Sequence, residues 1–409
     1  MKVHADNVKT ALVLPGGGAR GAFQVGVLKA IAEMSPHGCV NPFPVISGTS
    51  AGAINSVVLA SKARRFRVAV AELEKVWGGF HCEQVYRSDP LTMLKSSLHW
   101  FAAIVLGGAF VGTPKSLLDN SPLCSLLSRN IRFPRIQTAI DEGYLDAVAV
   151  TAAGYASARS TSFFQAADGV PPWSRTRRIG TRQTLNLDHL MASIAVPLIF
   201  PPVQINGEYF GDGAMRQATP LSPAIHLGAD RILVIGVRDE TALPSPSTNK
   251  PQTVPSFAQI AGYMLDTLFM DGLYSDLERM TRINQLIDSI PESQRSGLTA
   301  SMRPIDTMVV LPSQDLRQIA HKHLEQMPKP IRLLLRGLRG KEKSEDRLLS
   351  FLMFERAYTR DLIKLGYQDA MAVKDQLMGF VRGDKVPRLF APPWVKMDLS
   401  SYRKKYERR

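Results

Sequence analysis

The sequence predicts an α/β protein whose first strands are parallel. An apolar run at Ala11–Leu14 ends in Pro15 and three glycines, and a helical pattern follows it. A second short apolar run at Val45–Ser47 leads into another glycine-containing loop and a second helical pattern. The order strand, helix, strand, helix implies parallel pairing through right-handed crossovers.

Further strands are expected in the next part of the chain. Arg231–Val237 is the clearest interior strand, and Asn206-Gly207 is typical of a tight turn between two strands. The other expected strand segments are Ala147–Ala152, Ser160–Gln165 and the arms of a hairpin at Gln204–Phe210. No internal repeat or long low-complexity tract interrupts this pattern.

The composition predicts a first domain, a linker and a second region. The first domain spans residues 8–240 and includes a helical insertion or cap at 64–140. Pro, Ser and Thr cluster in the linker, 241–256, and the remainder, 257–409, is expected to be mostly helical and basic. The most apolar stretch, Trp100–Gly112, is too short to cross a bilayer, which needs about 20 residues; a buried or interfacial helix is expected there.

The net charge of +14 favours anionic partners, which include nucleic acid, anionic lipid and acidic substrates. Most of this excess lies in 321–409, which holds 21 basic and 11 acidic residues. The three cysteines form neither a disulfide pattern nor a metal-ligand spacing, which favours a reducing compartment. The amino terminus lacks the pattern of a signal peptide. A cytoplasmic protein, with or without peripheral membrane contact, is the expectation.

The first glycine-rich loop, Gly16-Gly17-Gly18-Ala19-Arg20-Gly21, fits the G-x-G-x-x-G spacing of dinucleotide-binding loops. That function also requires an acidic residue at the end of the next strand, and none stands near Ser47. The alternative is that backbone N–H groups around Gly16, Gly17 and Gly18 stabilise a developing negative charge, as in an oxyanion hole. A merely structural tight turn would explain one or two of the glycines.

The second loop, Gly48-Thr49-Ser50-Ala51-Gly52, matches the nucleophile elbow G-x-S-x-G between a strand and a helix. The serine of such an elbow is held on a sharp turn with its oxygen above the sheet. The motif occurs by chance in glycine-rich helix starts. Its position after a glycine-rich loop, in the right order of elements, strengthens the interpretation of Ser50 as a nucleophile.

A serine hydroxyl needs a positioned base to become nucleophilic. One arrangement is a triad of Ser50, Asp212 and His226, although His226 lies in a predicted helix entry behind Pro220. The other uses Asp212 alone, which stands between two glycines at the end of the hairpin strand. Taken alone, an aspartate in this context is more often a turn residue.

Together these motifs closely resemble the patatin-like phospholipase family, from Ala11 to Val237. The resemblance rests on the two glycine motifs, on Asp212-Gly213-Ala214 and on Ala192–Pro202 just before it. It implies a three-layer α/β/α fold with a mainly parallel central sheet, followed here by a helical C-terminal extension. It also implies a Ser50–Asp212 dyad, with an oxyanion hole formed by main-chain N–H groups of the first loop.

The expected activity is hydrolysis of fatty acyl esters of the phospholipase A or lysophospholipase type, through an acyl-enzyme and without metal or other cofactor. The lipid class, the positional preference and the oligomeric state stay open. Arg20 is a candidate contact for a substrate anion, and an electrostatic cap of the loop is an equal alternative.

The basic C-terminal region is a candidate contact for an anionic membrane. Leucines and arginines alternate at helical spacing from Ile331 to Lys341, and further basic residues follow at Arg403–Arg409. A solvated helix packed on the main domain is the plainer alternative. A different class of function, a basic protein that binds nucleic acid or membrane without hydrolase activity, is favoured only by the net charge. Nucleic acid is the weaker of those two partners because the basic tail carries no recognisable nucleic-acid-binding motif.

Overall fold

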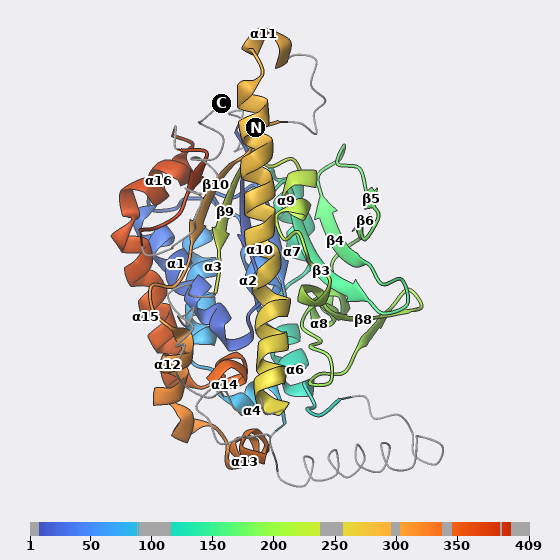
Figure 1. The fold of residues 1–409 in the computed structure, drawn as a ribbon, viewed down its shortest axis with the longest axis vertical. Coiled ribbons are helices and arrows are strands. Elements are labelled where there is room, and N and C mark those ends of the chain that lie inside the picture. Colours follow the sequence, from blue (N-terminus) through green and yellow to red (C-terminus); the bar gives the residue numbers. More distant parts are fainter. Residues whose placement is uncertain are drawn as a thin grey trace, which may run out of the picture.

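The computed structural model describes residues 8–87, 89, 116–237, 257–295, 303–337, 346–384 and 387–393. An eleven-stranded sheet runs through its centre in the order β11-β10-β9-β1-β2-β3-β4-β6-β5, and β8 joins β3 to β7 (Figure 1). The neighbours from β11 to β3 are all parallel. These parallel strands are β1 (Thr10–Leu14), β2 (Val45–Thr49), β3 (Ala147–Gly154), β9 (Arg231–Ile235), β10 (Asp306–Val310) and β11 (Leu389–Phe390).

Beyond β3 the sheet becomes mixed. Both β4 and β8 pair with β3 in the antiparallel sense. The turn from β7 to β8 has positive φ at Asn206 and Gly207, 51° and 85°, as the Asn-Gly pair predicts. The strands of this part are β4 (Ser160–Ala166), β5 (Trp173–Arg175), β6 (Arg178–Arg182), β7 (Val203–Ile205) and β8 (Glu208–Asp212).

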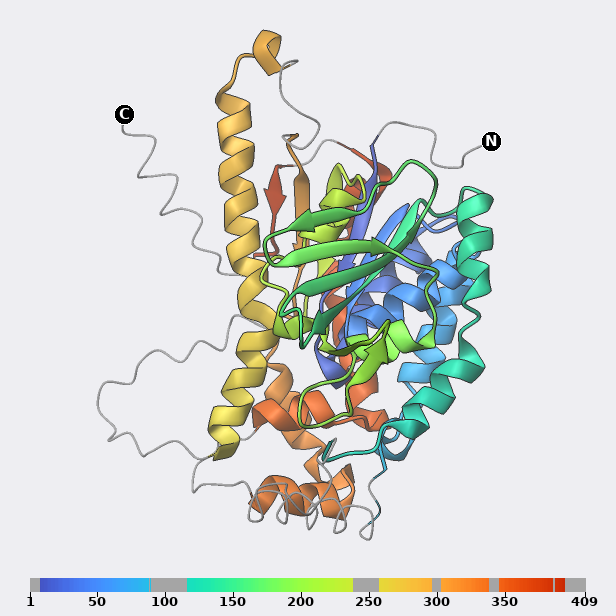
Figure 2. The ribbon, with the colours of Figure 1, turned by 90° about the vertical axis from the view of Figure 1, so that its right-hand side faces the viewer.

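Helices cover both faces of the sheet, because successive side chains of the buried strands point to opposite sides. Leu12 and Leu14 of β1 pack into one core cluster, and Ala11 and Val13 pack into the other. The first cluster contains helices α1 (Gly21–Met34), α2 (Ala51–Ser61), α3 (Phe66–Trp77), α15 (Arg356–Ala372) and α16 (Lys374–Arg382). The second contains α9 (Ser222–His226) and α10 (Phe257–Ser289), and α10 runs along the height of the molecule (Figures 1 and 2). This arrangement confirms the three-layer α/β/α fold.

The described part of the predicted insertion is helical. It comprises α3, α4 (Cys82–Val85), α6 (Ser121–Asn130) and α7 (Pro134–Asp141). The apolar stretch Trp100–Gly112 lies outside the described residues. The remaining helices are α8 (Leu187–Ser193), α11 (Glu292–Arg295), α12 (Leu316–Lys322), α13 (Lys329–Gly337) and α14 (Asp346–Leu352), with short 3₁₀ turns η1 (Gly18–Arg20), η2 (Gly213–Met215) and η3 (Leu324–Gln326).

The C-terminal region contributes directly to the central sheet. Its described residues are mostly helical, but β10 extends the sheet at β9 and β11 extends it at β10, which the sequence analysis did not predict. The whole of the predicted linker, 241–256, lies outside the described residues, as do residues 338–341 of the basic helix and the whole Arg403–Arg409 tail. Within the described ranges, none of the helices combines the length and apolar character that a bilayer crossing requires.

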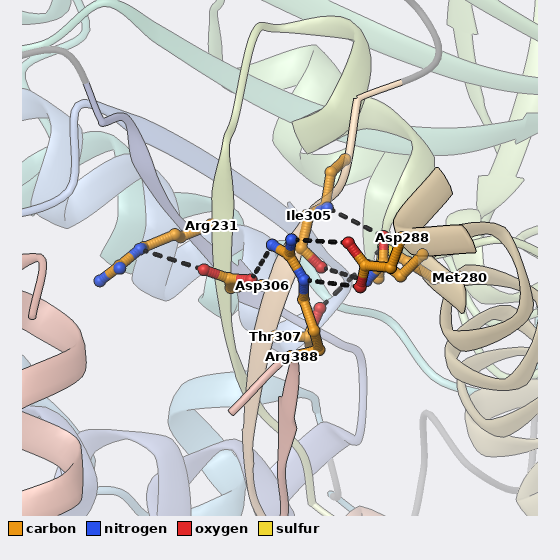
Figure 3. A network of polar contacts seen from close by, with 8 residues as sticks. Arg231, Met280, Asp288, Ile305, Asp306, Thr307 and Arg388 are labelled. Atoms are coloured by element: carbon orange, nitrogen blue, oxygen red, sulfur yellow. Dashed lines mark hydrogen bonds and ion pairs between the residues drawn. The ribbon is translucent and has the colours of Figure 1, made fainter. Parts of the chain in front are cut away.

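A polar network fastens these C-terminal strands to the rest of the molecule (Figure 3). Arg388, just before β11, donates to both carboxylate oxygens of Asp288 in α10, at 3.2 and 3.0 Å. It also donates to Asp306 at the start of β10, at 2.8 Å, and Asp306 forms an ion pair with Arg231 of β9 at 3.6 Å. Bidentate guanidinium–carboxylate contacts are geometrically specific, so this network fixes the register of three strands against one helix.

Candidate active site

Ser50 lies at the junction of β2 and α2 in a backbone conformation that non-glycine residues rarely adopt. Its φ is 54° and its ψ is −128°. Such conformations cost about 1–3 kcal/mol and persist only where the surroundings impose them. Here Ser50 is the single residue between the end of β2 and the start of α2. The side chain of Ser50 is therefore presented from the turn above the end of the sheet, as the elbow motif predicts.

The two glycines of the elbow are required by close backbone contacts. A Cβ on Gly52 would lie 1.9 Å from the carbonyl oxygen of Leu14 at the end of β1. A Cβ on Gly48 would lie 2.4 Å from the carbonyl oxygen of Gly52. The spacing of the motif therefore reflects how tightly β1, β2 and α2 meet at Ser50.

Asp212 ends β8, opposite Ala152 of β3, and its position is fixed by the backbone. Its N–H donates to the carbonyl oxygen of Ala195 at 2.8 Å. The next residue, Gly213, passes so close to β3 that a Cβ there would lie 2.1 Å from the carbonyl oxygen of Thr151. The Asp-Gly-Ala motif thus brings a carboxylate to the same sheet edge as the elbow.

The carboxyl of Asp212 is almost completely buried, at 1% exposed, and lies beside Ser50. Burial raises its pKa to about 7, while hydrogen bonding from the Ser50 hydroxyl and from the Ala214 N–H acts in the opposite direction. The Ala214 N–H donates to Oδ1 at 2.9 Å. Oδ2 accepts no hydrogen bond of conventional geometry from the described residues, so the Ser50 contact is a loose one. Loose contacts between nucleophile and base are common before substrate binds.

The first glycine-rich loop follows β1 and reaches the same place. Gly18 and Ser50 line one pocket, and Gly18 has a φ of 54° that favours glycine. Gly16 and Gly17 precede it in the turn, and a Cβ on Gly17 would lie 2.4 Å from Cγ2 of Val237. The loop and the elbow are therefore neighbours in space.

Arg20, the fifth residue of this loop, is buried, at 3% exposed. Its Nη2 donates to Oγ of Ser350 in α14 at 2.6 Å, and its guanidinium stacks 3.9 Å from the centre of the Phe351 ring. These contacts join the loop to the C-terminal region. They favour a role for Arg20 in holding the loop over a direct contact with a substrate anion.

Ser193, at the end of α8, joins the elbow to β3. Its hydroxyl donates to the carbonyl oxygen of Thr151 at 2.7 Å and accepts from the Ser50 N–H at 2.9 Å. Thr151 pairs with Thr49 of β2 in the sheet. The sequence contained Ser193 within the segment Ala192–Pro202, but no local pattern assigned it this contact.

A chain of buried amide and indole groups supports the loop and α2 from below. The Nε1 of Trp77 donates to Oδ1 of Asn55 at 2.8 Å, and Nδ2 of Asn55 donates to Oε1 of Gln24 at 2.9 Å. Nε2 of Gln24 in turn donates to the carbonyl oxygens of Pro15 and Ile235. Polar residues within apolar helices could have indicated buried hydrogen bonds, but the sequence alone does not show which of these residues bond to one another.

An almost wholly apolar pocket opens from Ser50. Ile54 and Trp77 line it on the α2 and α3 side, and Phe351, Leu352 and Phe354 line it from the C-terminal region. The other apolar side chains that line it are Phe80, Val85, Leu123, Ile194, Val196, Ile199 and Phe200. The sequence could not predict that the C-terminal region lines this pocket, because these residues lie about 300 positions from the elbow.

The triad alternative does not match the geometry. Nδ1 of His226 lies 2.8 Å from the carbonyl oxygen of Ser222, and its ring stacks on Trp173 with 4.8 Å between centroids. No histidine in the described ranges forms a hydrogen bond or ion pair with Asp212. Nor do three His, Cys, Asp or Glu side chains gather there as metal ligands would.

Known proteins resemble a short part of this chain. Patatin-like phospholipase domain-containing protein 7 from Rattus norvegicus and from Mus musculus is 50% identical over 52 residues, 13% of this chain. The chain spans only 4% of the length of these two relatives.

Solved structures with some likeness include human GIVD cytosolic phospholipase A2 in complex with methyl gamma-linolenyl fluorophosphonate. That likeness has a TM-score of 0.37 and 12% identity, over 92% of this chain and 60% of the other. VipD from Legionella pneumophila has a TM-score of 0.32 and 13% identity, over 92% and 69%.

The family model described as patatin-like phospholipase matches residues 12–225, slightly more than half of the 409 residues. The match begins in β1 and ends in α9, so it contains both glycine motifs and the Asp-Gly-Ala turn. The chain belongs to the patatin-like phospholipase family.

Proposed function

We propose that this protein is a lipid acyl hydrolase in which Ser50 is the nucleophile and Asp212 its general base. The observation that carries the proposal is the pairing of a strained elbow serine with a buried carboxyl whose pKa is about 7. A base with a pKa near neutrality is ionised often enough to accept a proton and acidic enough to return it. Family membership supports a lipid ester as the substrate.

In the first half-reaction, Asp212 accepts the proton of the Ser50 hydroxyl as Oγ attacks the ester carbonyl carbon. The tetrahedral intermediate carries its negative charge on the former carbonyl oxygen. Collapse breaks the ester bond, the departing alkoxide takes the proton from Asp212, and the acyl group stays on Ser50. In the second half-reaction, Asp212 takes a proton from water as the water oxygen attacks the acyl carbonyl carbon. Collapse then breaks the bond between the acyl group and Oγ, Ser50 takes the proton back from Asp212, and the fatty acid leaves.

The developing oxyanion would be held by main-chain N–H groups of the loop at Gly16, Gly17 and Gly18. The loop lines the same pocket as Ser50, and each such donor contributes on the order of 3 kcal/mol in comparable hydrolases. Ala51, the first residue of α2, also lines this pocket, so the helix N-terminus adds a positive partial charge on the same side.

The apolar lining of the pocket supports a hydrocarbon group as the acyl part of the substrate. Ser50 is only 3% exposed, and the pocket that it lines carries almost no polar side chain. A fatty acyl chain lying there would place its ester carbonyl beside Ser50, and its transfer from water would contribute about 0.8 kcal/mol per buried CH₂ group.

Turnover of a medium-chain p-nitrophenyl ester tests the proposal. Ser50→Ala and Asp212→Asn should each lose more than about 10³-fold in kcat/KM while melting cooperatively. Ser56→Ala is the matched control, because Ser56 is a buried serine on α2, the helix that begins directly after Ser50. Wild-type turnover in Ser50→Ala, or an equal loss in Ser56→Ala, would remove the proposal.

A further inference from the structure

A second cleft, distinct from the apolar pocket, lies on the α10 side of Asp212. It has a volume of about 830 Å³ and opens between the β5–β6 turn, the loop after Asp212 and the middle of α10. Five arginines line it, namely Arg175, Arg177, Arg178, Arg216 and Arg279. No aspartate or glutamate in the described ranges is among its lining residues.

The charge of these arginines is not compensated by ion pairs. In the part of the chain that the structure describes, none of the five pairs with a carboxylate within 4.0 Å. The contacts that they make are with neutral groups: Arg178 donates to the Thr219 hydroxyl, and Arg175 to the Ser174 carbonyl oxygen at 3.0 Å. The four that are most exposed are Arg175, Arg177, Arg216 and Arg279.

The positive charge of these arginines influences the pKa of two neighbouring groups, His226 and Asp276. Burial lowers the pKa of His226, and the charges of Arg175 and Arg178 lower it further. Asp276 is the carboxyl beside the cleft; burial raises its pKa to about 6, and its hydrogen bond with the Leu221 N–H and the charges of Arg178 and Arg279 oppose that rise. The half-buried carboxylate of Asp276 therefore lies near a cleft that five arginines line.

The cleft shares a wall with the proposed catalytic residues. Ala214, whose N–H donates to Asp212, lines the cleft. Gln217 also lines it and accepts a hydrogen bond from the Thr49 hydroxyl, one residue before Ser50. The apolar pocket belongs to the α2 and α3 side of the sheet and the cleft to the α10 side. The Ser50–Asp212 pair thus lies between an apolar cavity and a cationic one.

We propose that this arginine cleft binds the phosphate of an anionic phospholipid headgroup. Guanidinium groups match phosphate oxygens with paired N–H donors, and arginine clusters near a membrane attract anionic lipid. A nucleic acid fits less well, because no aromatic side chain lines the cleft and bases would have nothing to stack on. That the bound lipid is also the substrate rests on the proposed acyl hydrolase function; the binding itself does not.

The experiment measures binding of the Ser50→Ala protein to vesicles of phosphatidylcholine with and without phosphatidic acid, so that hydrolysis does not interfere. We expect selective binding to the vesicles with phosphatidic acid, weakened by salt. Adding Arg177→Gln, Arg216→Gln and Arg279→Gln should weaken this binding at least about tenfold, since each basic residue near an anionic surface contributes about a factor of five. These three side chains are exposed and form no ion pair with any residue that the structure describes, so the variant should melt like its parent.

A matched control removes three arginines from a second basic cleft, lined by Arg129, Arg132 and Arg135 on and beside α6 and α7. Their replacement by Gln changes the net charge equally and should leave vesicle binding within about twofold, because the effect depends on place rather than on total charge. Equal losses in the two triple variants, or unselective vesicle binding, would overturn the proposal.

Two competitors distinguish the source of the phosphate. Inorganic phosphate in the millimolar range should compete weakly; full displacement would assign the cleft to a free anion instead of a lipid. Duplex DNA that binds through these arginines, with vesicle binding unaffected by their loss, would assign it to nucleic acid. Hydrolysis of a neutral short-chain ester by the Arg177, Arg216 and Arg279 variant should persist, which separates failure of this proposal from failure of the proposed chemistry.

Discussion

At the scale of single residues, the proposed chemistry depends on the environment of Asp212. The same carboxyl on a solvated turn would titrate near 4 and would be a weak base. Here burial raises its pKa to about 7, and neighbouring donors limit the rise. The sequence predicted which residue this is, but not its burial, because the burial depends on packing against β3, which lies about 60 residues earlier in the chain.

The first prediction concerns the pH dependence of activity. Asp212 must be ionised to accept the Ser50 proton, so kcat/KM should rise about tenfold per pH unit below an apparent pKa of about 7 and then level off. Steady-state rates on a neutral ester, measured from pH 5 to pH 9 (about the range over which such a group titrates), check this. A profile still flat down to pH 5 would mean that the base has an ordinary carboxyl pKa.

The second prediction concerns stability. The folded protein holds a proton on Asp212 between about pH 4 and pH 7 that the unfolded chain has lost, so the free energy of unfolding should fall as pH rises through this window. Asp212→Asn removes this contribution to the pH dependence of the free energy of unfolding. Relative to wild type, the variant should therefore gain about 3 kcal/mol in free energy of unfolding between pH 5 and pH 8. Denaturant titrations at both pH values measure it, and an unchanged difference would contradict the raised pKa.

At the scale of secondary-structure elements, the site is the meeting point of β1, β2, β3 and β8. The strand–loop–helix units around the two glycine motifs were predictable, because each combines an apolar run, glycines and helical periodicity within about 20 residues. The contacts between these units were not predictable, since Ser193 reaches Ser50 only after α8 is packed under β3. Likewise β10, Asp306–Val310, is a short apolar run that nothing nearby distinguishes from a buried helix segment.

The third prediction tests the bridge made by Ser193. Ser193→Ala removes the acceptor of the Ser50 N–H and leaves that donor buried, so the elbow should shift. We expect kcat to fall tenfold or more with little change in KM, since the acyl pocket is untouched. Ser193→Thr keeps the hydroxyl and should recover part of the loss. Wild-type kcat in Ser193→Ala would show that the bridge does not position the nucleophile.

At the scale of the whole molecule, the C-terminal region completes the fold and the site. Helix α15 packs directly on α1: a Cβ on Gly26 would lie 2.0 Å from the carbonyl oxygen of Ile363, and a Cβ on Gly366 would lie 2.2 Å from that of Phe23. Residues from this region also wall the apolar pocket and hold Arg20. The sequence predicted a separate C-terminal extension, because the composition changes at 241–256. Local composition carries no information on long-range packing, so these contacts could not be predicted.

The fourth prediction follows from this packing. A chain that ends at Val237 loses β10, β11, α10 and α15, so it exposes the edge of β9 and the glycine face of α1. It should not unfold cooperatively and should aggregate on expression. The control ends at Pro393, keeps every described element and should melt within a few degrees of the full chain. Cooperative melting of the chain that ends at Val237 would show that the two regions fold independently.

The most direct test of the central claim is to label the protein with a fluorophosphonate probe and to map the modified residue by mass spectrometry. We expect a single adduct on Ser50, formed more slowly as pH falls below about 7 and absent in Ser50→Ala. An adduct on another residue, or labelling of Ser50→Ala at the wild-type rate, would contradict it.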